Sequence, residues 1–418
     1  MTPASAIGVA RAVDLLSRRE LSAEALLRDC LDRIAAREPD VQAWEALDAA
    51  GALREARRID GLRERPPLCG LPVGIKDLID TAGLPTAYGS PIYRGHRPAA
   101  DAVCVLRLRR AGAVVVGKTV TTEFAAYSPG KTRNPRDLSR TPGGSSSGSA
   151  AAVADGMVPL SLGTQTAASV IRPASFCGVI GWKPSHGAVP LTGVHALAPS
   201  LDTLGFFVRE LADVPVALAA LGAPLPPRDG RPPSLALCRT EAWDRAEPST
   251  QRALEQAAAR LGARELKLGA EFDGLVDAQL AIMAAEAAEA LGPELSRAPQ
   301  SLSPRLRELL EQGRAVAPER LARAHAQAAA CRRALAALLD GVDALLTPAA
   351  AGEAPPGLAA TGDPLFGRIW TLLRAPCVSL PLLRGPAGLP LGLQLVAAEG
   401  RDADLLAAAA HACRELSP

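Results

Sequence analysis

Short apolar runs alternate with helical patterns over much of the chain. Leu71–Ile75, Val114–Gly117 and Val158–Leu162 are each four or five residues long, a length that suits buried strands. A helix-like stretch from Asp101 to Ala111 comes before the second run. Because strands that alternate with helices bury their apolar faces against one another, the pattern predicts an α/β fold.

The same pattern returns at the end of the chain, after a helical middle. Pro224–Pro233 has the composition of a surface connection. Beyond it, Ala-, Leu-, Glu- and Arg-rich stretches predict long helices at about 249–263, 275–291 and 303–340. Apolar runs then reappear at Ala344–Leu346, Cys377–Leu382 and Leu391–Val396, before a final helix at about 402–415. We therefore expect one domain over residues 1–418, with a helical insert at about 225–345.

The N-terminal segment is expected to be helical over residues 4–36. Ser22 precedes a stretch in which Leu26, Leu27, Cys30 and Ile34 share one helical face. A serine at this place is suited to cap the first turn, because its hydroxyl can accept a hydrogen bond from a free backbone N–H. We therefore expect a helix to begin just after Ser22.

The charge balance excludes several classes of partner. The chain of 418 residues has 46 basic and 44 acidic side chains, so its net charge is only +2. That balance argues against binding to nucleic acid or to an anionic membrane. No charged-then-apolar leader follows Met1, and no apolar run approaches the roughly 18 residues of a membrane span. The expected location is the cytoplasm.

The eight cysteines indicate neither a metal site nor a disulfide frame. They are scattered, and none belongs to a C-x-x-C pair. Reduced, mostly buried thiols are the expected state.

A Gly- and Ser-rich stretch, T-P-G-G-S-S-S-G-S at 141–149, lies directly before a helix-forming run of alanines. Its residue types alone fit a structural turn, an anion-binding loop or a catalytic loop. The lysine of a phosphate-binding P-loop is absent. Adjacent glycines allow the backbone to approach other groups closely. The choice between a turn and a catalytic loop stays open at this level.

A second loop of small residues, Gly163–Cys177, contains Ser169 and leads into a helix in which Pro173 suits the first turn. Backbone amides at such a junction can point at a developing oxyanion. A serine in a tight turn is nevertheless more often a cap.

Lys76 ends the apolar run at Leu71–Ile75, where a lysine is usually solvated. Burial beside serines would lower its pKa and make it a base. Histidine offers no better base, because none of the five lies in a G-x-S-x-G or H-E-x-x-H context; they are His96, His186, His195, His325 and His411.

Taken together, these segments resemble the amidase signature family. The resemblance rests on P-G-G-S-S-S-G-S-A-A-A-V-A from Pro142, G-T-Q-T-A-A-S-V-I-R-P-A-S-F-C-G-V-I-G-W-K-P-S-H-G from Gly163, G-I-K-D at Gly74–Asp77, T-R-N-P at Thr132–Pro135 and S-L-D-T at Ser200–Thr203. The segment E-L-S-A-E-A-L-L-R-D-C-L and the ending G-L-P-L-G-L-Q-L also match, so nearly the whole chain is covered. The family implies a large central mixed β-sheet flanked by helices on both faces.

The family also implies a Ser–cis-Ser–Lys triad. On this chain its members fall on Lys76 as the base, Ser145 as the proton relay and Ser169 as the nucleophile. The family's cis peptide bond falls on Gly144–Ser145. The expected oxyanion hole uses the backbone amides of Thr166, Ala167, Ala168 and Ser169. The resemblance calls for no metal and no organic cofactor.

The chain departs from the family's pattern in two places. Ala167 and Ala168 replace the usual paired glycines, which would narrow the pocket by two methyl groups or require a tolerant loop. The usual Asp and Arg positions hold Gln165 and Ile171, and an arginine stands one residue later, at Arg172.

This variant resembles malonamidase-like and biuret- or allophanate-type members, whose substrates are small and carboxylated. One hypothesis is that Arg172 binds a substrate carboxylate through its fork of N–H donors. The alternative is a structural arginine bound to backbone carbonyls. Gly144 and Tyr127 are further candidates for substrate contacts. Phe124 and Tyr127 come before T-R-N-P, and for both aromatics the alternatives are a place in the pocket lining and packing in the core.

The function expected from the resemblance is hydrolysis of a small amide through an acyl-enzyme. An A-type amidotransferase subunit, which releases ammonia from glutamine for a partner enzyme, is the alternative. Members of the family are often dimers, so a homodimer is an open alternative to a monomer. The insert and residues 352–372 are expected to shape the pocket, and the sequence does not name the substrate.

Overall fold

The computed structural model describes residues 7–416, so residues 4–6 of the expected N-terminal helix lie outside the described part. Within it, eleven strands form one mixed sheet in the order β1-β3-β2-β4-β6-β5-β10-β11-β9-β7-β8. The strands are β1 (Trp44–Leu47), β2 (Pro72–Lys76), β3 (Val114–Thr119), β4 (Leu160–Gln165), β5 (Ile180–Lys183), β6 (Thr203–Val208), β7 (Leu235–Cys238), β8 (Arg264–Leu266), β9 (Ala344–Pro348), β10 (Cys377–Arg384) and β11 (Pro390–Val396). The α/β prediction is confirmed.

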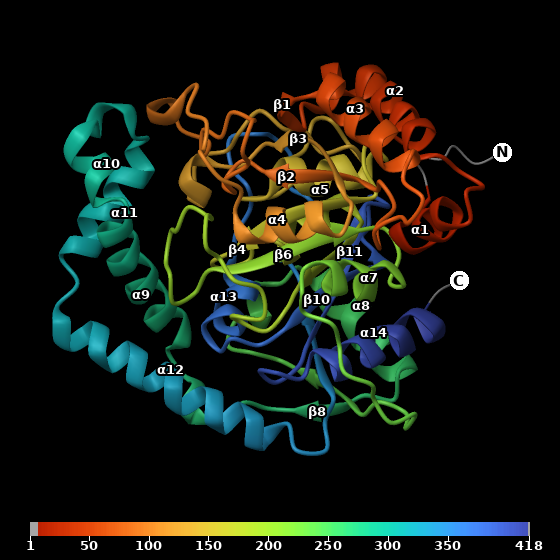
Figure 1. The fold of residues 1–418 in the computed structure, drawn as a ribbon. Helices are drawn as coiled ribbons and strands as arrows, with labels where there is room; N and C mark the ends of the chain where they lie inside the picture. Colours follow the sequence, from red (N-terminus) through yellow and green to blue (C-terminus); the bar gives the residue numbers. More distant parts are fainter. Residues whose placement is uncertain (1–6, 417–418) are drawn as a thin grey trace.

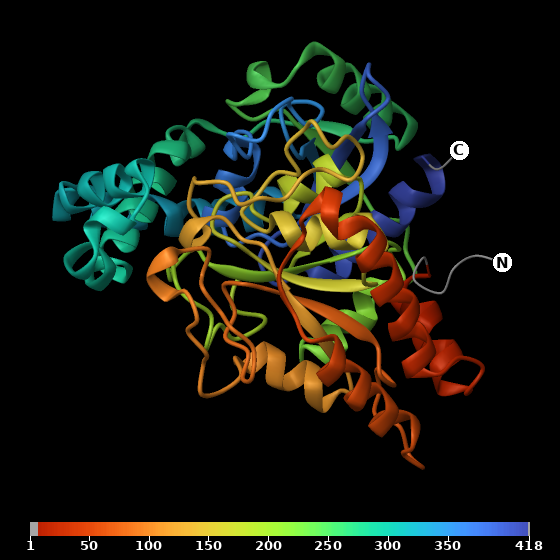
Figure 2. The same ribbon diagram turned by 90° about the horizontal axis from the view of Figure 1, so that it is seen from above.

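Helices cover both faces of this sheet (Figures 1 and 2). They are α1 (Val9–Ser17), α2 (Ala23–Val41), α3 (Ala49–Asp60), α4 (Val103–Arg110), α5 (Ser147–Ala154), α6 (Ile171–Cys177), α7 (Asp213–Ala220), α8 (Pro248–Arg260), α9 (Leu275–Ala290), α10 (Gly292–Arg297), α11 (Pro304–Arg314), α12 (Pro318–Leu338), α13 (Leu365–Leu372) and α14 (Asp402–Leu416). As expected, the Ser22 hydroxyl caps α2 by accepting a hydrogen bond from the Ala25 amide. No helix among residues 7–416 is long and apolar enough to cross a membrane.

The sheet combines parallel and antiparallel pairs. β2 lies between β3 and β4 and is parallel to both, while β4 is antiparallel to β6. Parallel neighbours bring their carboxyl ends to the same edge of the sheet, which is where α/β folds place their ligands. The ends of β2, β3 and β4 therefore form a natural platform for a site.

The insert differs from the sequence prediction in two respects. It is not wholly helical, because β7 and β8 pair with each other and β7 pairs with β9, so they extend the sheet at one end. The helix expected at about 303–340 is two helices, α11 and α12. The break falls before Pro318, which lacks an N–H and occupies the first turn of α12.

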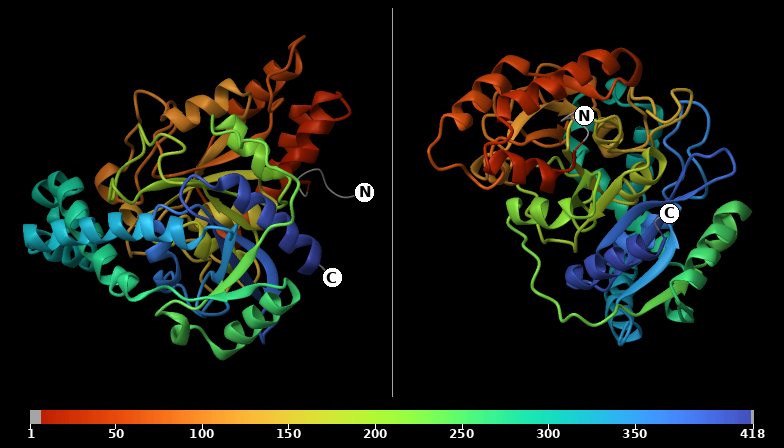
Figure 3. Two further views of the ribbon diagram at one scale, coloured as in Figure 1. Left: turned by 90° about the horizontal axis from the view of Figure 1, so that it is seen from below. Right: turned by 90° about the vertical axis from the view of Figure 1, so that its right-hand side faces the viewer.

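The insert helices α9, α10, α11 and α12 run along one side of the sheet and project from it (Figures 1 and 3). An apolar cluster attaches them to the body of the protein. Its buried members include Ile282 on α9, Leu310 on α11 and Leu335 on α12, together with Ile171 and Trp370 near the edge of the sheet. All described strands share one sheet, which supports the proposal of a single domain.

Candidate functional site

The candidate site is assembled at the carboxyl ends of β2 and β4. Lys76 is the last residue of β2, and Ser169 lies in the loop between β4 and α6. Ser145 lies in the Gly- and Ser-rich loop before α5. Because β2 and β4 are parallel neighbours, the lysine and the loop after β4 meet at one edge of the sheet.

Gly148 shows how closely the Gly- and Ser-rich loop lies against the sheet. A Cβ atom at this position would stand 2.2 Å from the Ala43 carbonyl oxygen and 2.4 Å from the Val120 amide nitrogen. Only glycine allows this approach of the first turn of α5. The composition of the loop is therefore a packing requirement, and it fixes the place of Ser145 three residues earlier.

Lys76 is fully buried. Its Nζ donates to the Ser145 Oγ at 2.8 Å and to the Thr164 Oγ1 at 2.7 Å. Burial lowers the pKa of Lys76 to about 7, although the nearby Asp202 carboxylate acts to raise it. A large fraction of the Lys76 side chains can therefore be neutral near pH 7, and the neutral form is the one that can act as a base.

Replacing Lys76 by methionine is expected to stabilise the protein. The pKa falls from 10.5 to about 7, so holding the amine neutral at pH 7 costs about 4 kcal/mol. Two lost hydrogen bonds offset roughly 2 kcal/mol of that gain. We expect Lys76→Met to raise the free energy of unfolding by about 2 kcal/mol at pH 7, as measured by urea titration.

This gain should shrink as the pH rises toward 10.5, because the unfolded lysine then also loses its proton. The exposed Lys131 supplies the control, and Lys131→Met should change stability little. A Lys76→Met protein less stable than the wild type at pH 7 would contradict the proposed cost of burial.

The two serines of the expected triad line one cavity. The peptide bond Gly144–Ser145 is cis, as the resemblance implied. Ser145 is 2% exposed and Ser169 is 8% exposed. The Ser169 hydroxyl makes no hydrogen bond to any residue in the described range 7–416. It is therefore available to a ligand in the cavity.

Gln165 organises the loop that carries Ser169. Its side-chain Oε1 accepts hydrogen bonds from the amides of Val170 and Ile171 at 2.9 and 3.1 Å. Its Nε2 donates to the Thr371 Oγ1 at 3.0 Å. A neutral side chain thus holds the start of α6, at the position where the family usually has an aspartate.

The four amides of the expected oxyanion hole are left without a partner by residues 7–416. The N–H groups of Thr166, Ala167, Ala168 and Ser169 have no hydrogen-bond acceptor among residues 7–416. The carbonyl oxygens of the same loop are held, since Thr371 Oγ1 donates to Ala167 at 2.7 Å and the Arg172 amide donates to Ala168 at 2.9 Å. With their carbonyls fixed, these amides can serve a ligand oxygen.

The two alanines fit the loop without backbone strain. Neither Ala167 nor Ala168 has a positive φ. Ala167 lines the cavity. The Ala168 methyl faces α13, where a Cβ at Gly367 would stand 2.6 Å from it. One methyl group therefore narrows the cavity, while the other fills space left by a glycine.

Two neighbours of the triad were not assigned a role from the sequence. Thr164 shares the Lys76 amine with Ser145. Asp202 accepts from the Thr166 Oγ1 at 2.5 Å and from the amides of Leu197 and Ala198. Burial raises the pKa of Asp202 to about 6, while Lys76 acts to lower it. Asp202 belongs to the S-L-D-T segment, and this motif was the one sequence feature that could have marked it as a site residue.

Arg172 combines features of both sequence hypotheses. Its Nη2 donates to the Gly144 carbonyl oxygen at 2.7 Å and to the Thr361 Oγ1 at 3.1 Å. Its Nε and Nη1 are buried and have no hydrogen-bond partner in the described part of the chain. Burial and the positive charge of Arg368 lower the pKa of Arg172. One nitrogen is thus structural, and two are left without an acceptor.

The cavity is small, at about 50 Å³, which leaves room for only a few water molecules. Tyr127 lines it as expected, whereas Phe124 does not and instead packs against His195 and Tyr93. Gly144 does not line it either; its carbonyl is held by Arg172. The other lining residues are Ala125, Ala126, Ser145, Thr166, Ala167, Ser169, Arg172, Leu197, Met283, Leu309, Thr361, Gly362, Pro364 and Arg368.

The segments expected to shape the pocket do so. Met283 and Leu309 come from the insert, and residues 361–368 contribute the remainder of one side. Arg368 was not singled out from the sequence. It lies on α13 among apolar residues, and no motif marks it.

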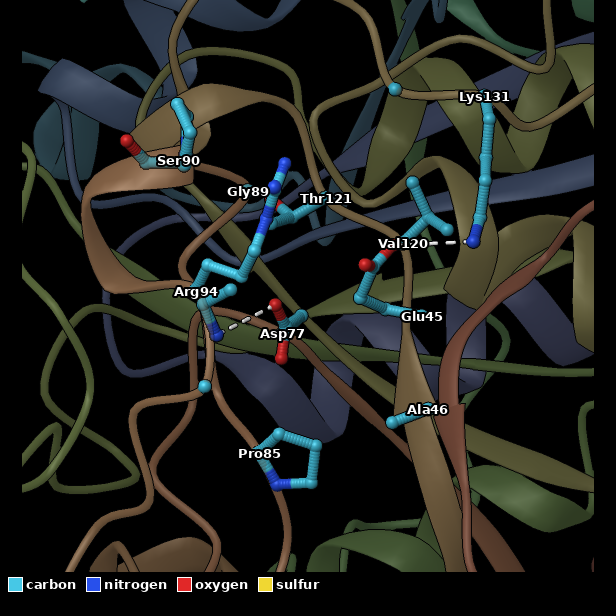
Figure 4. Close-up of a pocket in the computed structure, with 14 residues that line it drawn as sticks. Glu45, Ala46, Asp77, Pro85, Gly89, Ser90, Arg94, Val120, Thr121 and Lys131 are labelled. Atoms are coloured by element: carbon cyan, nitrogen blue, oxygen red, sulfur yellow. Dashed lines mark hydrogen bonds and ion pairs between the residues drawn. The ribbon is translucent and has the colours of Figure 1, made fainter. Parts of the chain in front are cut away.

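A larger cavity of about 450 Å³ lies next to the site (Figure 4). Asp77 faces it and accepts a hydrogen bond from the Ala87 amide at 3.0 Å. Lys131 and Glu45 form an ion pair across its rim at 3.4 Å. Lys76, Ser145 and Ser169 do not line it. Lys76 ends β2 and Asp77 begins the turn after it, and of the two only Asp77 lines this larger cavity.

Comparison with known proteins agrees with this geometry. A model of the amidase family matches residues 25–406. The chain belongs to the amidase family. A crystal structure of an amidase covers 98% of this chain and 100% of its own, with 32% identity and a TM-score of 0.90. A second solved structure comes from a vestigial protein complex that reveals the evolutionary origins of an s-triazine catabolic enzyme. The match covers 98% of this chain and 99% of that one, with 29% identity and a TM-score of 0.89.

A curated relative is the A-type subunit of the glutamyl-tRNA(Gln) amidotransferase of Roseiflexus castenholzii. It is 45% identical over 230 residues, which cover 53% of this chain and 47% of the relative. The chain spans about half the length of the curated relatives that it matches. Within the amidase family, the residues described above are therefore the basis for any assignment of activity.

Among residues 7–416 there is no group of three or more His, Cys, Asp or Glu side chains placed to hold a metal ion. The polar groups of the site are the Lys76 amine, the hydroxyls of Ser145 and Ser169, the four loop amides, and the guanidinium groups of Arg172 and Arg368.

Proposed function

We propose that the protein is an amidase that hydrolyses the carbon–nitrogen bond of a small, carboxylated amide through an acyl-enzyme on Ser169. One observation carries this proposal. The buried Lys76 amine donates to the Ser145 hydroxyl at 2.8 Å, and Ser145 shares a cavity with the unbonded hydroxyl of Ser169. A base, a relay and a nucleophile are thus grouped at one cavity.

The proton path follows from the donors and acceptors present. The Ser169 Oγ attacks the amide carbon, its proton passes to Ser145, and the Ser145 proton passes to neutral Lys76. The carbon–nitrogen bond then breaks, and the departing nitrogen receives the proton back along the same path. Water attacks the acyl-enzyme in the second half, which frees the acid and restores the Ser169 hydroxyl.

The amides of Thr166, Ala167, Ala168 and Ser169 are suited to bind the carbonyl oxygen during this attack. They have no acceptor within the described residues, and the carbonyls of Ala167 and Ala168 are already held. Donors fixed before the reaction stabilise a developing negative charge without a further cost of orientation.

The size and charge of the cavity support a small carboxylated substrate. Its small volume of about 50 Å³ favours a short amide over a bulky one. Arg172 lines the cavity and has two buried nitrogens, Nε and Nη1, without a hydrogen-bond partner among residues 7–416, and none of the described lining residues is acidic. Arginine matches the geometry of a carboxylate, so a carboxylate close to the amide completes the site electrostatically.

An ammonia-release assay over malonamate, malonamide, biuret, allophanate, glutamine and aryl amides tests this function. We expect malonamate or another short carboxylated amide to give the highest kcat/KM. Arg172→Gln should raise the KM for carboxylated amides on the order of 10-fold and affect the neutral malonamide less. Equal losses on both classes would remove the role of Arg172, and a preference for aryl amides would overturn the substrate class.

The alternative function is ammonia release from glutamine as an A-type amidotransferase subunit, which the curated relatives favour by identity. The cavity argues against it, because no described lining side chain is an acid that could pair with the α-ammonium group of glutamine. Glutamine turnover that increases when a co-purified partner is present would support the alternative.

We propose a cytoplasmic enzyme, and light scattering after size-exclusion chromatography would distinguish a homodimer from a monomer.

A further inference from the structure

Arg368 is a second cation on the wall of the candidate site. It extends from α13 and is 6% exposed. Its Nη1 donates to the Gln279 Oε1 at 2.5 Å, and its other two guanidinium nitrogens make no hydrogen bond to residues 7–416. Arg368 therefore keeps donors for a ligand in the cavity that it lines.

Two guanidinium groups thus line one small cavity without an acid between them. Arg172 and Arg368 form no direct ion pair with a carboxylate in the described part of the chain, and their charges repel; the Asp363 carboxylate acts on Arg172 only from beyond ion-pair distance. Charged groups out of water are normally paired with an opposite charge. The missing counter-charge is one that a ligand can bring.

We propose that Arg368 is a specificity-determining residue that binds the substrate carboxylate together with Arg172. This inference rests on the proposed function, since it names the second contact of the same carboxylate. Guanidinium forks bind carboxylates through paired N–H donors. One nitrogen of Arg172 already donates hydrogen bonds to Gly144 and Thr361. A second arginine therefore supplies the further N–H donors that bind an anion.

Gln279 is the positioning residue of this arrangement. It is fully buried on α9, where its Oε1 accepts from Arg368 and its Nε2 donates to the Thr166 carbonyl oxygen at 3.1 Å. One side-chain amide therefore fixes both Arg368 and the loop that carries Ser169. The distance between the bound carboxylate and the reacting carbon is set by the fold, which favours amides of one short length.

Arg368→Gln tests the proposal by the ratio of two substrates. We expect its KM for malonamate to rise on the order of 10- to 100-fold, with a smaller change in kcat, while the KM for malonamide changes much less. Arg368→Lys keeps the positive charge but not the forked arrangement of N–H donors. Its KM for malonamate should lie between those of the wild type and Arg368→Gln. Arg374→Gln removes an arginine that does not line the cavity and should leave both substrates unaffected. Equal changes with malonamate and malonamide in Arg368→Gln would overturn the proposal.

Malonate binding separates this proposal from the proposed reaction. We expect malonate, followed by isothermal titration calorimetry, to bind the wild type and Ser169→Ala more tightly than malonamide does. It should bind Arg368→Gln and Arg368→Lys more weakly. Malonate that binds Arg368→Gln as well as the wild type would sink the role of Arg368. A wild type that binds malonate in this way but cleaves no amide would sink the proposed function and leave the anion site standing.

Discussion

Ser169→Ala is expected to abolish ammonia release from every amide that the wild type accepts. The loss should be on the order of 10⁴-fold or more, as for the removal of a nucleophile whose partners act only through it. Ser169 is the only serine of the loop between β4 and α6, and its hydroxyl has no hydrogen bond within the described residues. The variant should therefore lose its activity without losing its fold.

The assay for Ser169→Ala is ammonia release at saturating substrate, alongside far-UV circular dichroism. Ser139→Ala is the matched control, because Ser139 is exposed and lies outside the cavity; it should keep wild-type activity. The alanine variant should still bind malonate, since Arg172 and Arg368 are untouched. Turnover in Ser169→Ala within 100-fold of the wild type would show that another group attacks the amide.

The physical features of the triad explain why the sequence could predict it. Each of its residues lies in a run of small or apolar residues that the backbone requires, as Gly148 shows by its 2.2 Å approach to the Ala43 carbonyl. Such runs are contiguous, so they form motifs. Lys76 alone was ambiguous, because a lysine at a strand end is usually solvated. Its burial results from the packing of β2 between β3 and β4.

The pocket wall was harder to predict, because it depends on contacts between distant segments. Arg368 and Gln279 meet across α13 and α9, and neither residue belongs to a motif. Apart from the two serines and the loop residues Thr166 and Ala167, the residue-level prediction for this wall included only Arg172 and Tyr127, although the segments were correctly named. Propensity and periodicity describe neighbours along the chain, and they do not indicate which helix faces which.

Short strands were missed for a similar reason. β7 has four residues and β8 has three, too few for a periodic pattern to stand out among the helices around them. Their membership of the sheet depends on pairing with β9, which lies far along the chain. The helical pattern of the longer segments led to the prediction of a wholly helical insert, and that prediction missed β7 and β8.

The pH dependence of the reaction should reveal the ionisation of Lys76. The proposed base works only when neutral, and burial lowers its pKa to about 7. Below that value, each pH unit reduces the neutral fraction about 10-fold, so kcat/KM should fall with that slope on the acid side and level off above pH 7. Ammonia release at constant ionic strength measures the profile, with circular dichroism at each pH to confirm the fold. An activity that is flat from pH 5 to pH 8 would exclude Lys76 as the base.

Asp202→Asn tests the assignment of Lys76 as the base by the direction in which the acid limb of the pH profile moves. A purely structural role of Asp202 would not produce this shift. The Asp202 carboxylate raises the pKa of Lys76, against the larger effect of burial. Asparagine removes the charge, so the pKa of Lys76 should fall and the acid limb should move to lower pH. Asp213→Asn is the matched control, since Asp213 is also a buried carboxylate that accepts backbone hydrogen bonds, from Ala10 and Glu210. It does not line the cavity, so this variant should leave the limb in place. A limb that moves to higher pH in Asp202→Asn would contradict the proposed coupling, because removing a negative charge cannot make a neighbouring ammonium group more stable.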